Sequence, residues 1–227
     1  MRDLKLSGAP PWLRAAPAIG LLDTALGTRF ARHGIGAARF VSEVLTTEHG
    51  DAIAEILLAG HFAPRLVSAA VFDGRRPGSA QAVARGLDWL IERDTTLVNL
   101  SFGLREDRAV LRQACERAVA AGATLVASTP ARGEAVYPAA YPGVLRITGD
   151  ARCSPGQVSH LDSRQADFGA CVGALQHHPG ALGGGASLAA AHVTAMLGQW
   201  LAKGGRGDPR RHLEALCQLH GAERRKP

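Results

Sequence analysis

The order of apolar and polar residues along the chain predicts alternating strands and helices. Short apolar runs that end in Gly, Asp or Ser are typical of buried strands, and apolar residues three and four positions apart are typical of helices. The short runs predict strands at 17–27, 65–74, 95–103, 123–129 and 143–150. The helical spacing predicts helices at 49–60, 78–94 and 105–122. Because the two kinds of element alternate, we expect one α/β domain over residues 1–227, with a mainly parallel sheet and helices on both faces.

The stretch from Phe168 to Ala202 contains no charged residue and raises the question of a membrane span. Gln176, His177 and Pro179 interrupt it, whereas a membrane helix needs about 20 consecutive apolar residues. We therefore expect this stretch to form buried core.

Four chemically active residues are predicted at the same edge of the sheet. Asp23 and Ser101 each end a predicted strand, His49 begins a predicted helix, and Ser187 begins another helix after the glycines at 183–185. Ligands of open α/β sheets bind beyond the carboxyl ends of the strands, so these side chains should lie close together. The glycines allow close backbone approach to Ser187, although a serine at a helix start is also an ordinary cap.

Composition and charge narrow the possible partners. The net charge is +6, but the basic residues are scattered and no aromatic residues interleave with them, so we expect no nucleic-acid partner. The end of the chain, 219–227, carries Arg224, Arg225 and Lys226 and is expected to be a flexible basic tail. The four cysteines form no C-x-x-C pair, which predicts reduced thiols without disulfides or zinc. No acidic run resembles a calcium loop. We therefore expect no metal and no cofactor.

The beginning of the chain carries no recognisable targeting signal. The apolar stretch from Ala15 to Leu22 is interrupted by Pro17 and followed by Asp23, so it lacks the core and cleavage site of a signal peptide. Only 22 residues precede Asp23, which leaves no propeptide in the expected organisation. These features predict a cytoplasmic protein that does not associate with membranes.

Five stretches of the chain carry a resemblance to a known family. They are LLDTALG around Asp23, HGDAIAEILLAG from His49, TLVNLSFG through Ser101, GATLVASTPARG with YPAAYPGVLRITG, and GASLAAAHVTAML around Ser187. The order Asp, His, Ser is that of subtilisin. Between about residues 17 and 200, the chain therefore resembles the subtilisin-like serine proteases.

This resemblance implies a three-layer α/β fold and a catalytic triad. Ser187 would be the nucleophile, His49 the base that takes its proton, and Asp23 the group that orients the imidazole and stabilises its charged form. The backbone N–H of Ser187 would supply one oxyanion donor, and His192 would be a buried structural residue. Taken singly, the three residues are also ordinary strand-end, helix-start and cap residues.

The oxyanion region departs from the family pattern. Pro130 and Ala131 stand where the family has Gly-Asn, so the Asn amide is missing. Ser128, Thr129 and Arg132 are the candidates for a replacement donor. A slow enzyme and an inactive pseudoprotease both explain this loss. The His motif also departs, because Asp51 stands two residues after His49, where it is expected to raise the basicity of the imidazole.

By resemblance, the substrate would lie as an added strand between 71–79 and 99–103. Arg75 and Arg76 would then favour acidic residues upstream of the cut, although a solvated turn explains them equally well. The pocket for the residue before the cut would be walled by Ser101, Phe102 and Gly103, and by Ala127, Ser128, Thr129 and Pro130.

The expected function is that of an intracellular serine endopeptidase that removes a leader peptide from a partner protein. Among compact subtilases, the chain resembles those that process leaders in the maturation of bacterial quinohaemoprotein amine dehydrogenase. Two alternatives stay open. One is a peptide-binding module of the same fold. The other is a nucleotide-binding protein that uses the glycines at 183–185, although a following Lys and a G-x-G-x-x-G are both absent.

Overall fold

A computed structural model describes residues 17–31, 33–59, 64–75, 78–174 and 185–221. The strands are β1 Ala18–Thr24, β2 Gly34–Arg39, β3 Arg65–Phe72, β4 Leu97–Leu100, β5 Thr124–Ser128, β6 Val144–Gly149, β7 Val158–His160, β8 Phe168–Ala170 and β9 Leu219–His220. The helices are η2 Thr28–Phe30, a 3₁₀ turn, and α2 Glu48–Leu58, α3 Ala80–Ile91, α4 Ala109–Ala120, α5 Ala186–Ala202 and α6 Pro209–Leu216.

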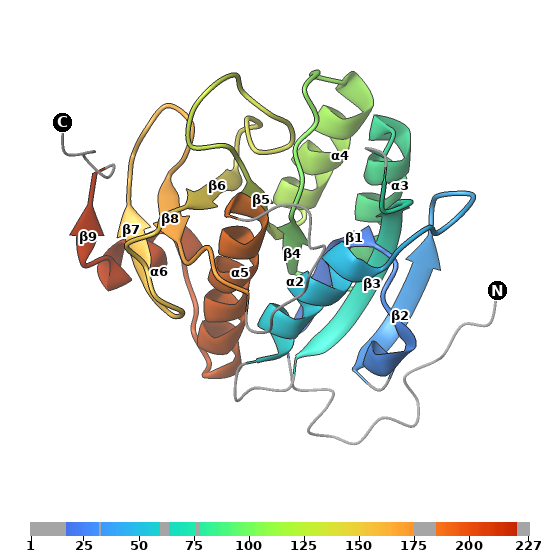
Figure 1. The fold of residues 1–227 in the computed structure, drawn as a ribbon, viewed down its shortest axis with the longest axis horizontal. Helices are drawn as coiled ribbons and strands as arrows, with labels where there is room; N and C mark the ends of the chain where they lie inside the picture. Colours follow the sequence, from blue (N-terminus) through green and yellow to red (C-terminus); the bar gives the residue numbers. More distant parts are fainter. Residues whose placement is uncertain (1–16, 32, 60–63, 76–77, 175–184, 222–227) are drawn as a thin grey trace.

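The described strands form one nine-stranded sheet in the order β2-β3-β1-β4-β5-β6-β8-β7-β9 (Figure 1). All neighbours are parallel except β7 and β8. The chain passes from β1 to β2 and β3 on one side, and then crosses to β4 on the other side of β1. In open α/β sheets such a reversal leaves a crevice at the carboxyl ends of the strands.

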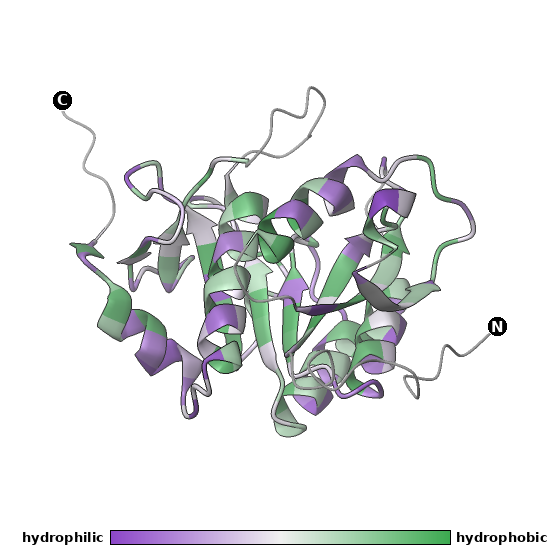
Figure 2. Ribbon diagram, turned by 90° about the horizontal axis from the view of Figure 1, so that it is seen from below, coloured by the Kyte–Doolittle hydropathy of each residue, from purple (hydrophilic) through white to green (hydrophobic). Residues whose placement is uncertain are grey.

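Helices cover both faces of the sheet. Side chains alternate across a strand, so Leu21 packs in a cluster with residues of α2 and α5, whereas Leu22 packs with residues of α3 and α4. In Figure 2 the central strands are largely hydrophobic, and the helices carry hydrophilic residues as well. The small residues at 189–191 are fully buried and let α5 lie close against the sheet. The predicted three-layer α/β fold is confirmed.

A buried carboxylate, that of Asp167, joins several elements near the far edge of the sheet. Asp167, which precedes β8, pairs with Arg146 of β6 at 2.7 Å and with Arg210 of α6 at 3.0 Å. These guanidinium groups and their hydrogen bonds outweigh burial and keep the pKa of Asp167 below its ordinary value. The stretch through α6 is therefore part of the packed domain.

The prediction of a flexible tail over 219–227 is wrong for the first three residues of that range. Leu219 and His220 form β9, which pairs with Ser159 and His160 of β7, and the guanidinium of Arg152 donates to the carbonyl of Gly221 at 2.6 Å. Backbone pairing thus fixes these residues, and the basic side chains of the tail lie after them, at 224–226. Residues 222–227 lie outside the described residues.

The described residues contain no helix long and apolar enough to cross a bilayer. The expected core character of 168–202 is confirmed where it is described, because β8 and most of α5 are buried.

Candidate active site

Asp23, His49 and Ser187 come from three elements that reach the same edge of the sheet. Asp23 is the last residue but one of β1 and is fully buried. His49 lies in the first turn of α2, and Ser187 in the first turn of α5. Because α2 and α5 pack side by side on one face, the two helix starts bring these residues to the end of β1.

The carboxylate of Asp23 holds the ring of His49. Its Oδ1 lies 2.7 Å from Nδ1 of His49 and accepts the backbone N–H of Thr24, also at 2.7 Å. Oδ2 is buried and has no hydrogen-bond partner among the described residues. A buried carboxylate bonded to Nδ1 fixes the tautomer that leaves Nε2 free to accept a proton.

The glycine that follows His49 has a geometric role. The backbone N–H of Gly50 donates to Oγ1 of Thr24 at 2.9 Å, which ties the start of α2 to the end of β1. A Cβ at position 50 would lie 2.6 Å from that oxygen and 3.0 Å from the carbonyl oxygen of Thr24. The close approach that aligns His49 with Asp23 therefore requires glycine.

Asp51 has a different role from the expected one. Its carboxylate accepts the backbone N–H of Gly27 at 2.7 Å and the hydroxyl of Thr47 at 3.2 Å, and it lies 3.4 Å from Arg29. Asp51 thus anchors the loop after β1 to α2. The expectation that it raises the basicity of His49 is wrong, because its side chain is occupied by these partners and the groups that shift the pKa of His49 do not include it.

The pKa of His49 lies above its ordinary value of 6.5. Burial lowers this pKa, while the charge of Asp23 and its hydrogen bond to the ring raise it and prevail. The side chain of His49 is 26% exposed, so substrate can reach the ring.

We expect the acid limb of the kcat/KM profile to lie above pH 6.5. A base must be neutral to accept the serine proton, so activity falls as the pH drops through the pKa of His49. The sign for stability is opposite. Because the folded pKa is raised, protonated His49 stabilises the fold below pH 6.5, and this contribution is lost as the pH rises through the folded pKa.

The measurements are kcat/KM against pH and the pKa of the His49 ring by NMR. In Asp23→Asn the charge that raises the pKa of His49 is removed, while burial still lowers this pKa. The ring pKa of His49 should therefore fall below 6.5. A wild-type acid limb centred below 6.5 contradicts the prediction.

The hydroxyl of Ser187 is bonded to a backbone carbonyl. It donates to the carbonyl oxygen of Ser101 at 3.0 Å, and the hydroxyl of Ser101 donates to the carbonyl oxygen of Ser187 at the same distance. Among the described residues, no hydrogen bond joins Ser187 to His49. Catalytic hydrogen bonds are often long without substrate, and a turn of the Ser187 side chain would be required for it to pass a proton to His49.

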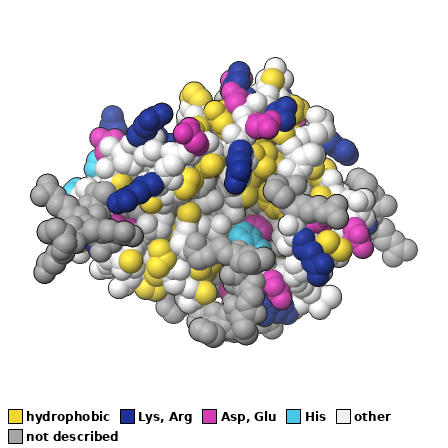
Figure 3. Space-filling view, turned by 45° about the horizontal axis from the view of Figure 1, so that its top comes forward, with side chains coloured by type: hydrophobic (Ala, Val, Ile, Leu, Met, Phe, Trp, Pro, Cys, Tyr) yellow, Lys and Arg dark blue, Asp and Glu magenta, His cyan; other side chains and the backbone are white. Residues whose placement is uncertain are grey.

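A groove of about 310 Å³ opens beside these residues. It is lined by Asp23, Thr24, His49, Phe72, Gly74, Arg75 and the segment 101–104. The rings of Phe72 and Phe102 meet edge to face at 4.8 Å and give it an apolar wall. Figure 3 turns this edge of the sheet toward the viewer and shows hydrophobic side chains beside a histidine near the middle of the face. Arg75 is exposed at the groove, while Arg76 and Gly183–Gly184 lie outside the described residues.

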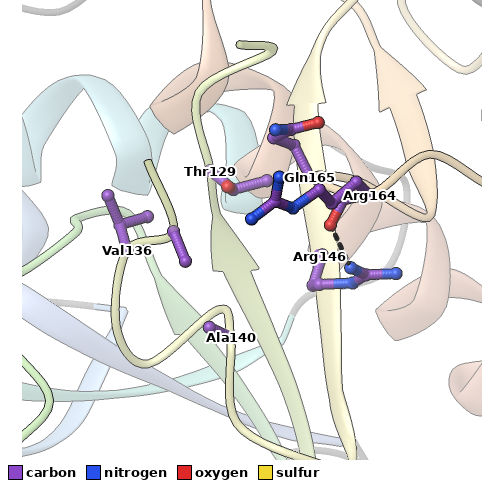
Figure 4. Close-up of a pocket in the computed structure, with 7 residues that line it drawn as sticks. Thr129, Val136, Ala140, Arg146, Arg164 and Gln165 are labelled. Atoms are coloured by element: carbon purple, nitrogen blue, oxygen red, sulfur yellow. Dashed lines mark hydrogen bonds between the residues drawn. The ribbon is translucent and has the colours of Figure 1, made fainter. Parts of the chain in front are cut away.

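The residues predicted around the oxyanion divide between the two faces of β5. Val126 packs in the cluster beneath α2 and α5, so Ser128, two positions later, lies on the same face as Ser187. The side chain of Thr129 instead lines a small pocket of about 40 Å³ with Val136, Arg164 and Gln165 (Figure 4). Ser128 is thus better placed than Thr129 to face Ser187.

Beyond β5, the chain is exposed at Pro130, Ala131 and Arg132. Ala127 is fully buried. The amide of Gln165 donates to the carbonyl of Gly133 at 3.2 Å, which ties this loop to the turn before β8.

Three features of the site were missed in the sequence. Asn99 and Thr194 are buried polar residues inside apolar runs, and Val136 lies against Gly103. The polar interruptions of the apolar runs at 99 and 194 are the sequence signal for the first two.

His192 is buried as predicted, with Nε2 2.9 Å from the carbonyl oxygen of Gly173. The described residues include no group of three or more His, Cys, Asp or Glu able to hold a metal ion.

Known structures share this fold at low sequence identity. The prenylagaramide maturation protease PagA superposes with a TM-score of 0.61 and 19% identity, over 88% of this chain and 82% of that chain. The protease domain of PatA gives a TM-score of 0.57 and 17% identity, over 86% and 84%. At this identity the likeness shows the fold.

Known sequences are similar over part of the chain. The minor extracellular protease Epr of Bacillus subtilis is 31% identical over 112 residues, which are 44% of this chain and 17% of Epr. The thermostable alkaline protease of Halalkalibacterium halodurans is 29% identical over 144 residues, 57% of this chain and 40% of that protein. The chain thus matches less than half the length of either relative.

The family comparison covers most of the chain. Residues 29–216 match the description of the subtilase family, from shortly after Asp23 to the end of α6. This span includes His49, Ser101 and Ser187, which meet at one edge of a subtilisin-like sheet. The family resemblance expected from the motifs is therefore confirmed, and the chain belongs to the subtilase family.

Proposed function

We propose that the protein is a serine endopeptidase whose triad is Asp23, His49 and Ser187. The observation that carries this proposal is the 2.7 Å contact between Asp23 and Nδ1 of His49, in a groove that also contains Ser101, the hydrogen-bond partner of Ser187. Membership of the subtilase family supports the same activity.

The proposed reaction follows from these positions. The hydroxyl of Ser187 leaves the carbonyl of Ser101, gives its proton to Nε2 of His49, and its oxygen attacks the substrate carbonyl. Asp23 stabilises the imidazolium. The resulting oxyanion is bound by the backbone N–H of Ser187, one of the free N–H groups in the first turn of α5. His49 then protonates the leaving amine, and water hydrolyses the acyl-enzyme by the same steps.

The proposed substrate is a peptide or protein that carries a leader. The groove would hold it as an added strand against 99–103, with an apolar side chain against the wall that Phe72 and Phe102 form together. Arg75 at the same groove would favour acidic residues upstream of the cut. PagA is a maturation protease, which supports a similar role here. Removal of a leader from the small subunit of quinohaemoprotein amine dehydrogenase, and action in the cytoplasm, are finer hypotheses from the sequence.

A fluorophosphonate probe tests the proposed activity directly. It should label Ser187 of the wild-type chain, and labelling should be lost in His49→Ala. A peptide-binding module is the second candidate, because Ser187 is bonded to Ser101 rather than to His49 and the oxyanion Asn is missing. A chain that binds peptides but takes no label supports that candidate.

Val136 predicts a preference for a small residue before the cut. A Cβ on Gly103 would lie 2.9 Å from Cβ of Val136, and paired hydrogen bonds between Leu104 and Tyr137 (2.7 and 2.8 Å) hold the two segments together. Val136 also lines the pocket beside Thr129. It therefore stands between the two walls proposed for the pocket that takes the residue before the cut.

In Val136→Gly, we expect peptides with Leu or Phe before the cut to gain about tenfold in kcat/KM relative to peptides with Ala, because each excluded methylene group matters by about that factor. Val119→Ala, at a partly buried valine that packs on Gly143, is the matched control and should leave the ratio unchanged. An unchanged ratio in Val136→Gly contradicts this placement of the pocket.

A further inference from the structure

A chain of buried polar side chains runs from the middle of α5 to the nucleophile. Asn99 of β4 and Thr194 of α5 are both fully buried, within otherwise apolar packing. The hydroxyl of Thr194 donates to Oδ1 of Asn99 at 3.0 Å. The amide of Asn99 donates to the hydroxyl of Ser101 at 2.7 Å. Burial of polar groups is costly unless they are bonded, and these bonds link the buried layer to the active site.

In this series of hydrogen bonds each side chain donates to the next, and the last acceptor is the backbone carbonyl of Ser187. Because the hydroxyl of Ser101 accepts from Asn99, its own proton is free for the carbonyl oxygen of Ser187, at 3.0 Å. The hydroxyl of Thr194 also lies 2.8 Å from the carbonyl of Ala190. The carbonyl of Ala190 already accepts the backbone N–H of Thr194 in the helix. The hydroxyl proton of Thr194 is therefore assigned to Oδ1 of Asn99, which would otherwise lack this donor.

The first turn of α5 lacks the usual means of fixing its position. Its N-cap is Gly185, at φ +91°, and among the described residues no side chain forms a cap hydrogen bond there. A side-chain cap would satisfy a free N–H and hold the turn in place. The hydrogen bonds exchanged between Ser101 and Ser187 join this turn to the end of β4 instead.

We propose that Asn99 and Thr194 are positioning residues that hold Ser187 at the reacting edge through Ser101. This inference rests on the proposed protease function. Thr194 and Asn99 fix the hydroxyl of Ser101, and Ser101 fixes the backbone of Ser187. The placement of both the nucleophilic oxygen and the oxyanion-binding N–H depends on that backbone. Neither Asn99 nor Thr194 touches the substrate.

The test replaces Thr194 by Val, which keeps the shape of the side chain and removes the hydroxyl. We expect kcat for peptide cleavage and the rate of fluorophosphonate labelling of Ser187 to fall about three- to tenfold, the effect of one ordinary hydrogen bond, with KM unchanged. Thr194→Ser, which restores a hydroxyl, should recover both rates.

Ser159→Ala is the matched control. Ser159 is equally buried and donates to Asp150 at 2.6 Å, on β7 at the far edge of the sheet. It should lower Tm without changing kcat or labelling. If Thr194→Val lowers only Tm, as Ser159→Ala does, the positioning role is overturned.

If Thr194→Val does not fold, Ser101→Ala carries the test. It removes the last link of the chain at the groove, and it should slow labelling of Ser187 by a similar factor. Unchanged labelling in Ser101→Ala overturns the proposal. A wild-type chain that takes no label overturns the protease function and this inference together, whereas a labelled wild type with unaffected variants overturns only the positioning role.

Discussion

Ser187→Ala is expected to abolish peptide cleavage while the fold and peptide binding persist. Under the proposed mechanism the variant loses the hydroxyl that is acylated, so kcat should fall by on the order of 10⁴-fold or more. The structural loss is small, because the hydroxyl is only half-buried and its bond is to the carbonyl of Ser101. The measurements are cleavage of a peptide substrate, peptide affinity and Tm of the same preparations.

His49→Ala and Asp23→Ala give the matching comparison. In the proposed mechanism the three residues act as one unit, so combining either substitution with Ser187→Ala should add little to the loss. Near-wild-type turnover by Ser187→Ala contradicts the proposed mechanism. Losses that multiply across the three variants contradict a shared catalytic unit.

The central layers could be predicted from the sequence because each element there has a strong local signal. β1 and β3 are nearly continuous apolar runs, and α3 has regular apolar spacing with a serine cap, Ser79, whose side chain accepts from the N–H of Ala82. The strand ends then place Asp23 and Ser101 at the same edge, whatever the details of packing. These local signals are sufficient to predict that the two residues share one site.

The outer strands could not be predicted in the same way. β2 has the sequence GIGAAR, whose small residues give no clear alternation, and β7, β8 and β9 are only two or three residues long. Short strands are stabilised by their neighbours rather than by local preference. The bond between Asn99 and Thr194 joins residues 95 positions apart, and no local pattern reports such a pair.

The second large effect that we expect is a rise in kcat when an oxyanion donor is restored. The motif resemblance predicts that Ala131 takes the place of the family's Asn. Ala131 is exposed just beyond β5, so an amide side chain can be placed there without disturbing the core. In the proposed mechanism, the oxyanion then depends on the backbone N–H of Ser187 at the start of α5. The N–H groups of a helix's first turn have no partner within the helix and favour negative charge.

We therefore expect Ala131→Asn to raise kcat by about tenfold to a hundredfold, with little change in KM. Loss of one oxyanion donor costs about 10²- to 10³-fold in kcat, because the donor acts on charge that develops only in the transition state, and we expect the introduced Asn to recover part of this factor. The measurement is kcat and KM of both chains on one peptide. Ala131→Leu, which adds similar bulk without a donor, is the control and should give no gain.

An existing donor would produce the opposite pattern. Ser128 is buried and lies on the same face of β5 as Ser187, so its hydroxyl is the candidate on that face to replace the missing amide. If Ala131→Asn leaves kcat unchanged and Ser128→Ala lowers it by tenfold or more, the hole is already complete and the expected deficit is wrong. Thr129→Val should have no comparable effect, because the side chain of Thr129 lies in the pocket on the other face of β5.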